Sequence, residues 1–210
     1  MNSAQDSFRT HCLDFYTWDV GRGAPLLDRF DCRRLAIDHR IPRHLLEAFI
    51  LIESNRRPAW LRFLERMTLI ANGLVFALFA TPIRNLSVGV LQVRLSVAAP
   101  LLDLPVKVVH ERWITPTIRT TLSERVNLFR RLLLVVDDTA NVSIGAKHIS
   151  DLIWRCHSLG DNVFYITLGN LYNGGAASAS GLNLSYGDVL REVAATRLCG
   201  GRNRASALLS

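Results

Sequence analysis

Cysteine and histidine side chains are the first candidates for chemistry in this chain, because both can bind metal ions and take part in catalysis. Four of them could together supply a zinc site: Cys12, Cys32, His39 and His44. The spacing of the two histidines suits a zinc finger, but the two cysteines lie far apart and Pro42 separates the histidines. We therefore expect no metal site, and we interpret His44 as a helix residue near solvent.

Three short groups of residues resemble parts of catalytic or phosphate-binding sites. The Cys156–His157 pair holds a nucleophile and a base, but adjacent helix residues do not face each other, and no third group orients the histidine. The Asp137–Asp138 pair is typical of a solvated helix end. Gly174–Gly175 lacks the lysine that follows the glycines of a phosphate-binding loop. The sequence thus predicts neither an enzyme nor a cofactor.

The charge of the chain limits the class of partner. Its net charge is +7 and its pI is about 9.8, which allows weak attraction to RNA or to an anionic membrane surface. Lys107 and Lys147 are the only lysines, and the arginines are spread along the whole chain. This excess of arginine is typical of a gene that is read in a second frame over another gene. Two fragments mix cations with aromatic rings, as single-stranded RNA-binding surfaces do: Arg112–Trp113 and Phe129–Arg131.

Composition and length indicate a single globular domain. Apolar residues make up 49% of the chain and charged residues 20%, and 210 residues can form a sizeable core. The four cysteines are too dispersed for a disulfide framework and the polar N-terminus is no secretory signal, so we expect reduced thiols in the cytosol. We expect an irregular N-terminal segment of strands or loops packed on the core (1–37), a globular domain (38–199) and a disordered tail (200–210).

Apolar spacing, helix caps and prolines predict the regular elements. Helices are expected over residues 42–57, 60–83, 121–137, 147–157 and 185–199, and strands over 86–97, 106–110 and 163–168. The alternation within 86–97 slips by one residue at Val90–Leu91, which indicates a β-bulge in one long strand or a break between two short ones. A turn is expected at Asn173–Gly175 and a loop at Ala176–Gly181. The predicted fold class is α+β, a mainly helical single domain with a small β-sheet.

The run from Met67 to Ile83 contains no charged residue. A membrane-spanning helix needs about 20 apolar residues, whereas this run is shorter and includes Asn72 and Gly73. We interpret it as a helix buried in the core, with Leu74 and Phe76 inside. The alternative is a segment that associates with a membrane.

One stretch, Ile41–Pro58, combines helix signals with a recognisable spacing. Pro42 suits the first turn of a helix, because its missing N–H would have no partner there. Pro58 disfavours helix at the residue before it and ends the element. The helix between them has one apolar stripe, formed by Leu45, Leu46, Phe49 and Ile50.

This stretch is similar to the F-box-like motif of the RNA-silencing suppressors of poleroviruses and enamoviruses. In that motif Leu-Pro, two variable residues and Leu are followed ten to thirteen residues later by Pro. Here Ile41-Pro42-Arg43-His44-Leu45 is followed by twelve residues and then by Pro58. Ile41 stands where the family has Leu, which is a volume-conserving change.

The resemblance implies a viral suppressor of host RNA silencing in the host cytoplasm. Such a protein is an F-box-like adaptor that engages a Skp-type subunit of a cullin ubiquitin ligase and brings an Argonaute protein for degradation. The resemblance assigns partner binding to Ile41, Pro42, Leu45, Leu46, Ile50 and Pro58, with the apolar residues as anchors of a helix in a groove. Two alternatives are a basic RNA-binding suppressor and a membrane-associated viral accessory protein.

Overall fold

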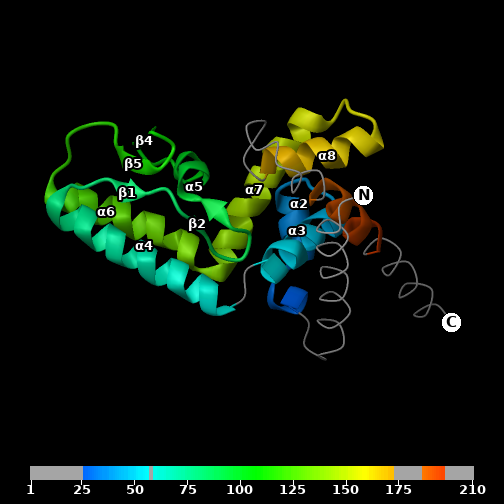
Figure 1. Ribbon diagram of the computed structural model, residues 1–210, viewed down its shortest axis with the longest axis horizontal. Coiled ribbons are helices and arrows are strands. Elements are labelled where there is room, and N and C mark those ends of the chain that lie inside the picture. The colour runs from blue at the N-terminus through cyan, green and yellow to red at the C-terminus, as the bar shows by residue number, and fades with distance from the viewer. Residues whose placement is uncertain (1–25, 57–58, 173–185, 197–210) are drawn as a thin grey trace, which may run out of the picture. The chain divides into compact units, whose positions relative to one another are not determined.

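The computed structural model describes residues 26–56, 59–172 and 186–196. These residues form helices, a three-stranded antiparallel sheet and a two-stranded antiparallel sheet (Figure 1). The fold class is therefore α+β and mainly helical, as the sequence predicts. The chain forms two compact units where we expected one domain. Unit 1 comprises residues 1–55 and 149–210, and unit 2 comprises residues 56–148.

Unit 1 is built from helices around α3. Its elements are η1 (Leu26–Arg29), α2 (Cys32–Asp38), α3 (Arg43–Arg56), the end of α7 (Asp138–Cys156), α8 (Asp161–Tyr172) and a helix over residues 186–196. Every residue of α3 from 45 to 54 is buried. The ring of Phe49 lies 4.5 Å from that of Tyr172 and 6.1 Å from that of Tyr186, measured between centroids. The core of unit 1 thus surrounds α3.

Unit 2 combines helices with both sheets. Its helices are α4 (Ala59–Phe79), α5 (Leu95–Leu101), α6 (Leu122–Leu132), η2 (Leu133–Val136) and the start of α7. One sheet has the order β1 (Ile83–Arg84), β5 (Trp113–Pro116), β4 (Val106–Val109), and β2 (Ser87–Val88) pairs with β3 (Val93–Arg94). Ile83 pairs with Ile114 across β1 and β5, and both are buried. α4 packs against α6 and β1.

Local signals at two helix starts are confirmed. The N–H groups of Leu45 and Leu46 donate to the carbonyl of Pro42 at 3.0 and 3.2 Å, so α3 begins directly after this proline. At α6 the predicted capping box is present: the Thr121 hydroxyl accepts from the Glu124 N–H, and the Glu124 carboxylate accepts from the Thr121 N–H. Because these bonds favour the ionised carboxyl group, they lower the pKa of Glu124.

α4 confirms the helix predicted from Trp60 but not its complete burial. Phe76 is buried as predicted, whereas Leu74 is 52% exposed, so its assignment to the core is wrong. The physical reason is that unit 2 covers α4 on one side only. The helix ends at Phe79, and Ile83 belongs to β1. Among the described residues, no helix is both long enough and apolar enough to cross a bilayer.

The region from Leu86 to Val97 forms two short strands and the start of a helix. Gly89 has a φ of 83° and Gln92 a φ of 49°, so the chain reverses between β2 and β3. The slip in the alternation at Val90–Leu91 therefore marks a hairpin turn and not a bulge. The strand predicted at residues 95–97 is wrong, because Leu95, Ala98 and Ala99 lie at helical spacing and are buried in α5.

Other predicted elements differ in type or length. Residues 163–168 belong to α8 and not to a strand, because their apolar run packs as one helix. The fourth predicted helix is part of α7, which begins at Asp138. Asp137 starts α7 and does not end α6, since its carboxylate accepts from the Ala140 N–H at 2.8 Å. β4 confirms the strand predicted at 106–110, and β5 was not predicted.

The N-terminal segment is partly helical. Residues 32–37 of the segment that we predicted as strands or loops belong to α2, and the Asp31 side chain caps this helix by accepting from the Arg34 N–H at 2.9 Å. The helix over residues 186–196 agrees with the last predicted helix. The predicted turn at 173–175, the loop at 176–181 and the tail at 200–210 lie outside the described residues.

Candidate interaction surfaces

The apolar residues of the Ile41–Pro58 stretch lie inside unit 1. Four of them are at most 5% exposed: Ile41, Leu45, Leu46 and Ile50. Pro42 is exposed at the start of α3, and Pro58 lies outside the described residues. The four buried side chains stabilise the core of unit 1. Their binding to a partner stays a prediction, and it requires that unit 1 opens around α3.

Two glutamates of α3 are buried, and each has a hydrogen-bond partner. The hydroxyl of Tyr186 donates to Oε1 of Glu53 at 2.9 Å, which ties α3 to the helix over residues 186–196. Nε of Arg43 donates to Oε1 of Glu47 at 2.6 Å within α3. Both carboxylates are only 3% exposed, and a buried carboxylate is costly unless it has such partners. The sequence places both glutamates on the polar side of the helix, so their burial was not predicted.

The accessible part of the stretch is the corner between α2 and α3. Arg40 has a φ of 54°, and the Ile41 N–H donates back to the carbonyl of Ala36 at 2.9 Å, so the chain turns sharply here. The turn leaves Ile37 68% exposed, and Pro42 is exposed beyond it. This corner can therefore be reached by a partner while α3 stays buried.

A hollow of about 530 Å³ adjoins this corner in unit 1. It is lined by Arg40 and by residues at the end of α7: Ser150, Asp151, Ile153, Trp154, Arg155 and His157. Trp154 is 73% exposed, and its ring stacks on that of His157 with centroids 4.9 Å apart. Exposed tryptophan and arginine are the residues that most often dominate protein–protein binding. We call Ile37, Arg40, Pro42, Trp154 and Arg155 the corner surface.

The sequence contains a signal for this surface that our prediction did not use. Ile149, Leu152 and Cys156 recur at helical spacing and are buried. Trp154 lies off that stripe, on the side of the helix that a core does not need. A tryptophan on the polar side of an amphipathic helix indicates a contact surface.

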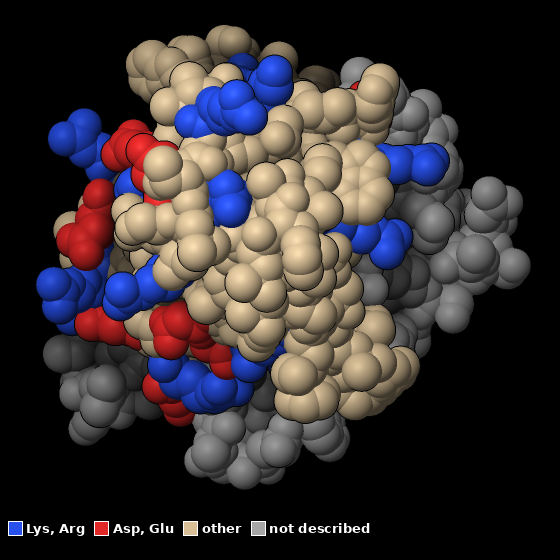
Figure 2. All heavy atoms as spheres, turned by 90° about the vertical axis from the view of Figure 1, so that its left-hand side faces the viewer, with Lys and Arg blue, Asp and Glu red and all other residues tan. Residues whose placement is uncertain are grey.

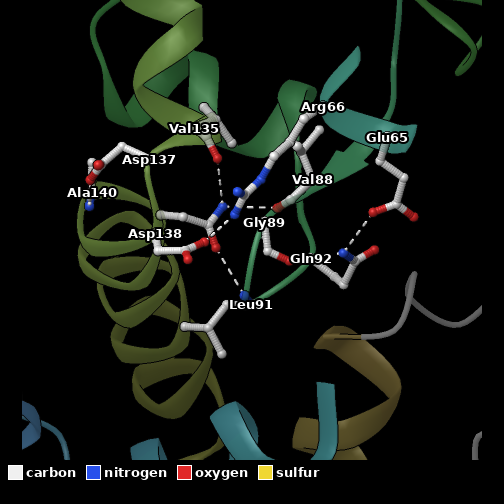
Figure 3. Close-up of polar contacts among 11 residues, drawn as sticks. Glu65, Arg66, Val88, Gly89, Leu91, Gln92, Val135, Asp137, Asp138 and Ala140 are labelled. Atoms are coloured by element: carbon white, nitrogen blue, oxygen red, sulfur yellow. Dashed lines mark hydrogen bonds and ion pairs between the residues drawn. The ribbon is translucent and has the colours of Figure 1, made fainter. Parts of the chain in front are cut away.

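Unit 2 contains a buried polar centre around Asn141, whose hydrogen-bond partners are labelled in Figure 3. Nδ2 of Asn141 donates to the carbonyls of Val88 at 2.8 Å and Val135 at 3.1 Å, and its Oδ1 accepts from the Leu91 N–H at 2.9 Å. Gly89 leaves room for this amide, since a Cβ there would lie 2.3 Å from Cγ of Asn141. The side chain therefore joins α7 to η2 and to the turn between β2 and β3.

Two further contacts attach α4 to the same region of unit 2. Arg66 forms an ion pair with Asp138, and Nε2 of Gln92 donates to Oε2 of Glu65 at 3.0 Å (Figure 3). Asp138 thus pairs with a guanidinium at the start of α7. Every bond in this centre connects one element of unit 2 to another or caps a helix, so we assign it a structural role.

The side chains that could bind metal or act as nucleophiles are not brought together. Among the described residues, no group of three or more His, Cys, Asp or Glu side chains could hold a metal ion, and Cys12 lies outside them. Cys156 is buried, and this burial raises the pKa of its thiol, which reduces the thiolate that a nucleophile needs. Nδ1 of His157 lies 2.6 Å from the carbonyl of Trp154.

The two fragments that mix cations with aromatic rings differ in exposure. Phe129 is buried in unit 2, where a Cβ on Gly73 would lie 1.9 Å from its ring. Arg131 donates to the carbonyl of Leu102. This fragment therefore joins α6 to α4 and α5. Arg112 and Trp113 are both exposed and form a single pair of the kind that stacks on RNA bases.

Two accessible surfaces result from this geometry: the corner surface in unit 1 and the exposed side of α4 in unit 2. Comparisons of the chain with protein-family models, with curated proteins and with solved structures find no match. The support for a function consists of these two surfaces and the spacing of Ile41–Pro58.

Proposed function

We propose that the chain is a viral suppressor of host RNA silencing that acts in the host cytoplasm as an F-box-like adaptor. It binds a Skp-type subunit of a cullin ubiquitin ligase and brings an Argonaute protein to that ligase for degradation. The observation that supports this proposal is the spacing of Ile41–Pro58, together with a helix that begins directly after Pro42 and ends at Arg56. The accessible corner before this helix provides a place for the ligase subunit.

The contact with the Skp-type subunit uses the corner surface. Leu45 and Leu46 are buried and position α3, so their role in binding is indirect. Trp154 is the anchor, because it combines the largest exposed apolar area of the corner surface with a neighbouring hollow. Arg40 lines the same hollow and adds a charged contact at its edge.

Binding of the purified full chain to a purified plant Skp-type protein tests this proposal. Trp154→Ala should weaken binding about tenfold or more, since a tryptophan anchor contributes roughly 2 kcal/mol. Its thermal unfolding should stay near that of the wild type, because the side chain is exposed. Trp60→Ala is the matched control: it removes a tryptophan of similar exposure from α4 and should leave the affinity unchanged.

The biological readout is Argonaute abundance and silencing in leaves that express each variant. Trp154→Ala should lose suppression together with binding, while Trp60→Ala keeps binding to the ligase subunit. A wild-type protein that does not bind a Skp-type partner, or a Trp154→Ala protein with unchanged affinity, contradicts the proposed docking. Leu45→Ala is unsuitable as a binding test, because loss of this buried side chain should destabilise unit 1.

A further inference from the structure

α4 directs Glu65 and Arg66 toward other elements of unit 2 and many of its apolar residues toward solvent. On the covered side, Arg66 pairs with Asp138, and Glu65 accepts from Gln92. On the other side, eight apolar residues are about half exposed or more: Trp60, Phe63, Leu64, Met67, Leu74, Val75, Leu78 and Phe79. An ordinary surface helix has the opposite arrangement. We call these eight residues the apolar stripe.

The apolar stripe offers a partner few polar groups. Its members fall into two groups, within residues 60–67 and 74–79, along a helix of 21 residues, which is about 30 Å long at 1.5 Å per residue. Thr68 and Asn72 lie beside the stripe, but both side chains donate to carbonyls of α4 itself at 2.8 Å. The exposed side of α4 is therefore mainly hydrocarbon and aromatic surface, interrupted near its middle by Thr68.

α6 extends this surface at the end of α4. Nε of Arg125 donates to the carbonyl of Ala77 at 2.9 Å, which places the start of α6 beside the last turn of α4. Leu122 and Val126 flank Arg125 in the sequence, and both are exposed. Figure 2 shows this end of unit 2 as a broad area with few charged side chains, bordered in parts by Lys and Arg and on one side also by Asp and Glu.

The whole net charge of the chain comes from the sequence of unit 2. Residues 56–148 contain 13 arginines and lysines against 6 aspartates and glutamates, whereas the rest of the chain contains 12 of each. Seven of the cations described in unit 2 are exposed: Arg84, Arg94, Lys107, Arg112, Arg119, Arg130 and Lys147. The unit that carries the apolar stripe is therefore also the unit that attracts anions.

We propose that unit 2 docks on the surface of an anionic lipid bilayer, with the apolar stripe at the boundary between headgroups and acyl chains. Such a surface accepts the apolar side of a helix that lies in its plane, and its anionic headgroups attract the surrounding arginines and lysines. This docking is independent of the corner surface in unit 1.

Two other occupants fit these observations less well. A second copy of unit 2 would bring the same positive excess to the contact, and the stripe lacks the flanking charged residues that pair helices in coiled coils. RNA would need cations where its phosphates lie, and the exposed side of α4 has none. Of these three occupants, only the lipid surface uses both the apolar stripe and the charge of unit 2.

Sedimentation of the full chain with two kinds of vesicle tests this docking. The wild type should bind vesicles of phosphatidylcholine and phosphatidylserine, and should bind at least tenfold more weakly to phosphatidylcholine alone. Leu74→Asp and Leu78→Asp should each reduce binding to the anionic vesicles at least tenfold. Leu78→Gln, which adds no charge, should also reduce it, and this variant separates loss of apolar contact from repulsion by the anionic lipid.

A matched control comes from unit 1. Val163 in α8 has nearly the same exposure as Leu74, at 54% against 52%, so Val163→Asp makes the same change of charge on an exposed apolar residue. It should leave vesicle binding unchanged. The Leu74 and Leu78 variants should keep the thermal unfolding of the wild type and its binding to a Skp-type protein. Failure of the lipid-docking proposal can therefore be distinguished from failure of the proposed function.

Four results would overturn the proposal. They are failure of the wild type to bind anionic vesicles, unchanged vesicle binding by Leu78→Asp, a dimer in solution that Leu78→Asp dissociates, and salt-sensitive binding to short duplex RNA in place of vesicles. The dimer would identify a second copy as the occupant of the stripe. The RNA result would assign the charge of unit 2 to nucleic acid.

Discussion

α3 in unit 1 and α4 in unit 2 follow each other in the chain, yet polarity and burial are related in opposite ways in the two helices. α3 carries Glu47 and Glu53 in a buried environment. α4 is the more apolar helix, but Leu78 and Phe79 are more than 60% exposed while Arg66 pairs with a residue of its own unit. The apolar content of a helix therefore does not determine how much of it is covered.

The difference lies in what each unit packs against its helix. Within the described residues of unit 1, α3 has Tyr172 of α8 against Phe49, and Tyr186 binds Glu53 beyond it. In unit 2, α4 packs against α6 and β1, and its other side faces solvent. A core helix can hold charges if each one has a partner, and an apolar helix left half covered provides a surface for another molecule.

The largest expected difference in stability is between two leucine-to-alanine variants, one in each helix. Leu46→Ala in α3 should lower the free energy of unfolding by about 2–5 kcal/mol, because the side chain is fully buried. Leu74→Ala in α4 should change it by no more than about 0.5 kcal/mol, because that side chain is half exposed. Urea unfolding followed by circular dichroism measures both. An equal loss in the two variants would mean that α4 is covered in solution, and the comparison would no longer hold.

Removing a side chain of the polar centre should destabilise unit 2 more than removing one from the exposed side of α4. Asn141→Ala leaves the Leu91 N–H and the carbonyls of Val88 and Val135 without this partner. Each buried group left unsatisfied costs about 1–3 kcal/mol, so we expect a loss of at least about 2 kcal/mol in the free energy of unfolding.

Asn72→Ala is the control for this change, since the Asn72 amide bonds only to a carbonyl of its own helix. It should be nearly neutral in the same urea titration, because alanine is a better helix former than asparagine. A small loss for Asn141→Ala, similar to that for Asn72→Ala, would show that the centre does not stabilise unit 2.

Features controlled by neighbouring residues could be predicted from the sequence. Pro42 sets the start of α3, and Thr121 with Glu124 sets the start of α6, because each signal acts within one turn of helix. The same holds for the strand that begins at Val106. These elements account for the correct fold class.

Features that depend on distant residues could not be predicted. The spacing in α4 gives apolar positions on several sides, and only the packing of α6 and β1 decides that Leu74 is exposed. The apolar run from Val163 to Leu168 is compatible with a strand or a helix until its neighbours are known. The corner surface combines Arg40 with Trp154 from α7, and no spacing along the chain connects them.

A smaller difference in stability should distinguish a closely packed glycine of unit 1 from one with open space around it. A Cβ on Gly187 would lie 2.6 Å from Cα of Ile166 and 2.8 Å from the carbonyl oxygen of Tyr165, both of which are backbone atoms. Gly187→Ala should therefore cost about 1–3 kcal/mol through overpacking between α8 and the helix over residues 186–196. Gly160→Ala, where nothing lies within 4 Å, should be neutral or slightly stabilising. Equal melting temperatures for the two variants would refute the close approach of these helices.

The smallest expected effect is a pH dependence of stability that comes from His44, in the first turn of α3. Burial of His44 lowers its pKa below the ordinary value of 6.5, and the nearby Glu47 carboxylate opposes part of this shift. The unfolded chain therefore binds the proton of this histidine more readily than the folded chain does. As the pH falls through about 6.5 toward the folded pKa, His44 should reduce the free energy of unfolding, and above that window it should contribute nothing.

His44→Gln removes this dependence, so the free energy of unfolding should fall less between pH 7 and pH 5 in the variant than in the wild type. Urea titrations of both proteins across this range measure the difference, and the contributions of the other histidines cancel in it. A wild type that gains stability relative to His44→Gln as the pH falls would mean that Glu47 outweighs burial. The start of α3 would then be open to solvent, as α4 is, and the contrast between the two helices would be limited to their later turns.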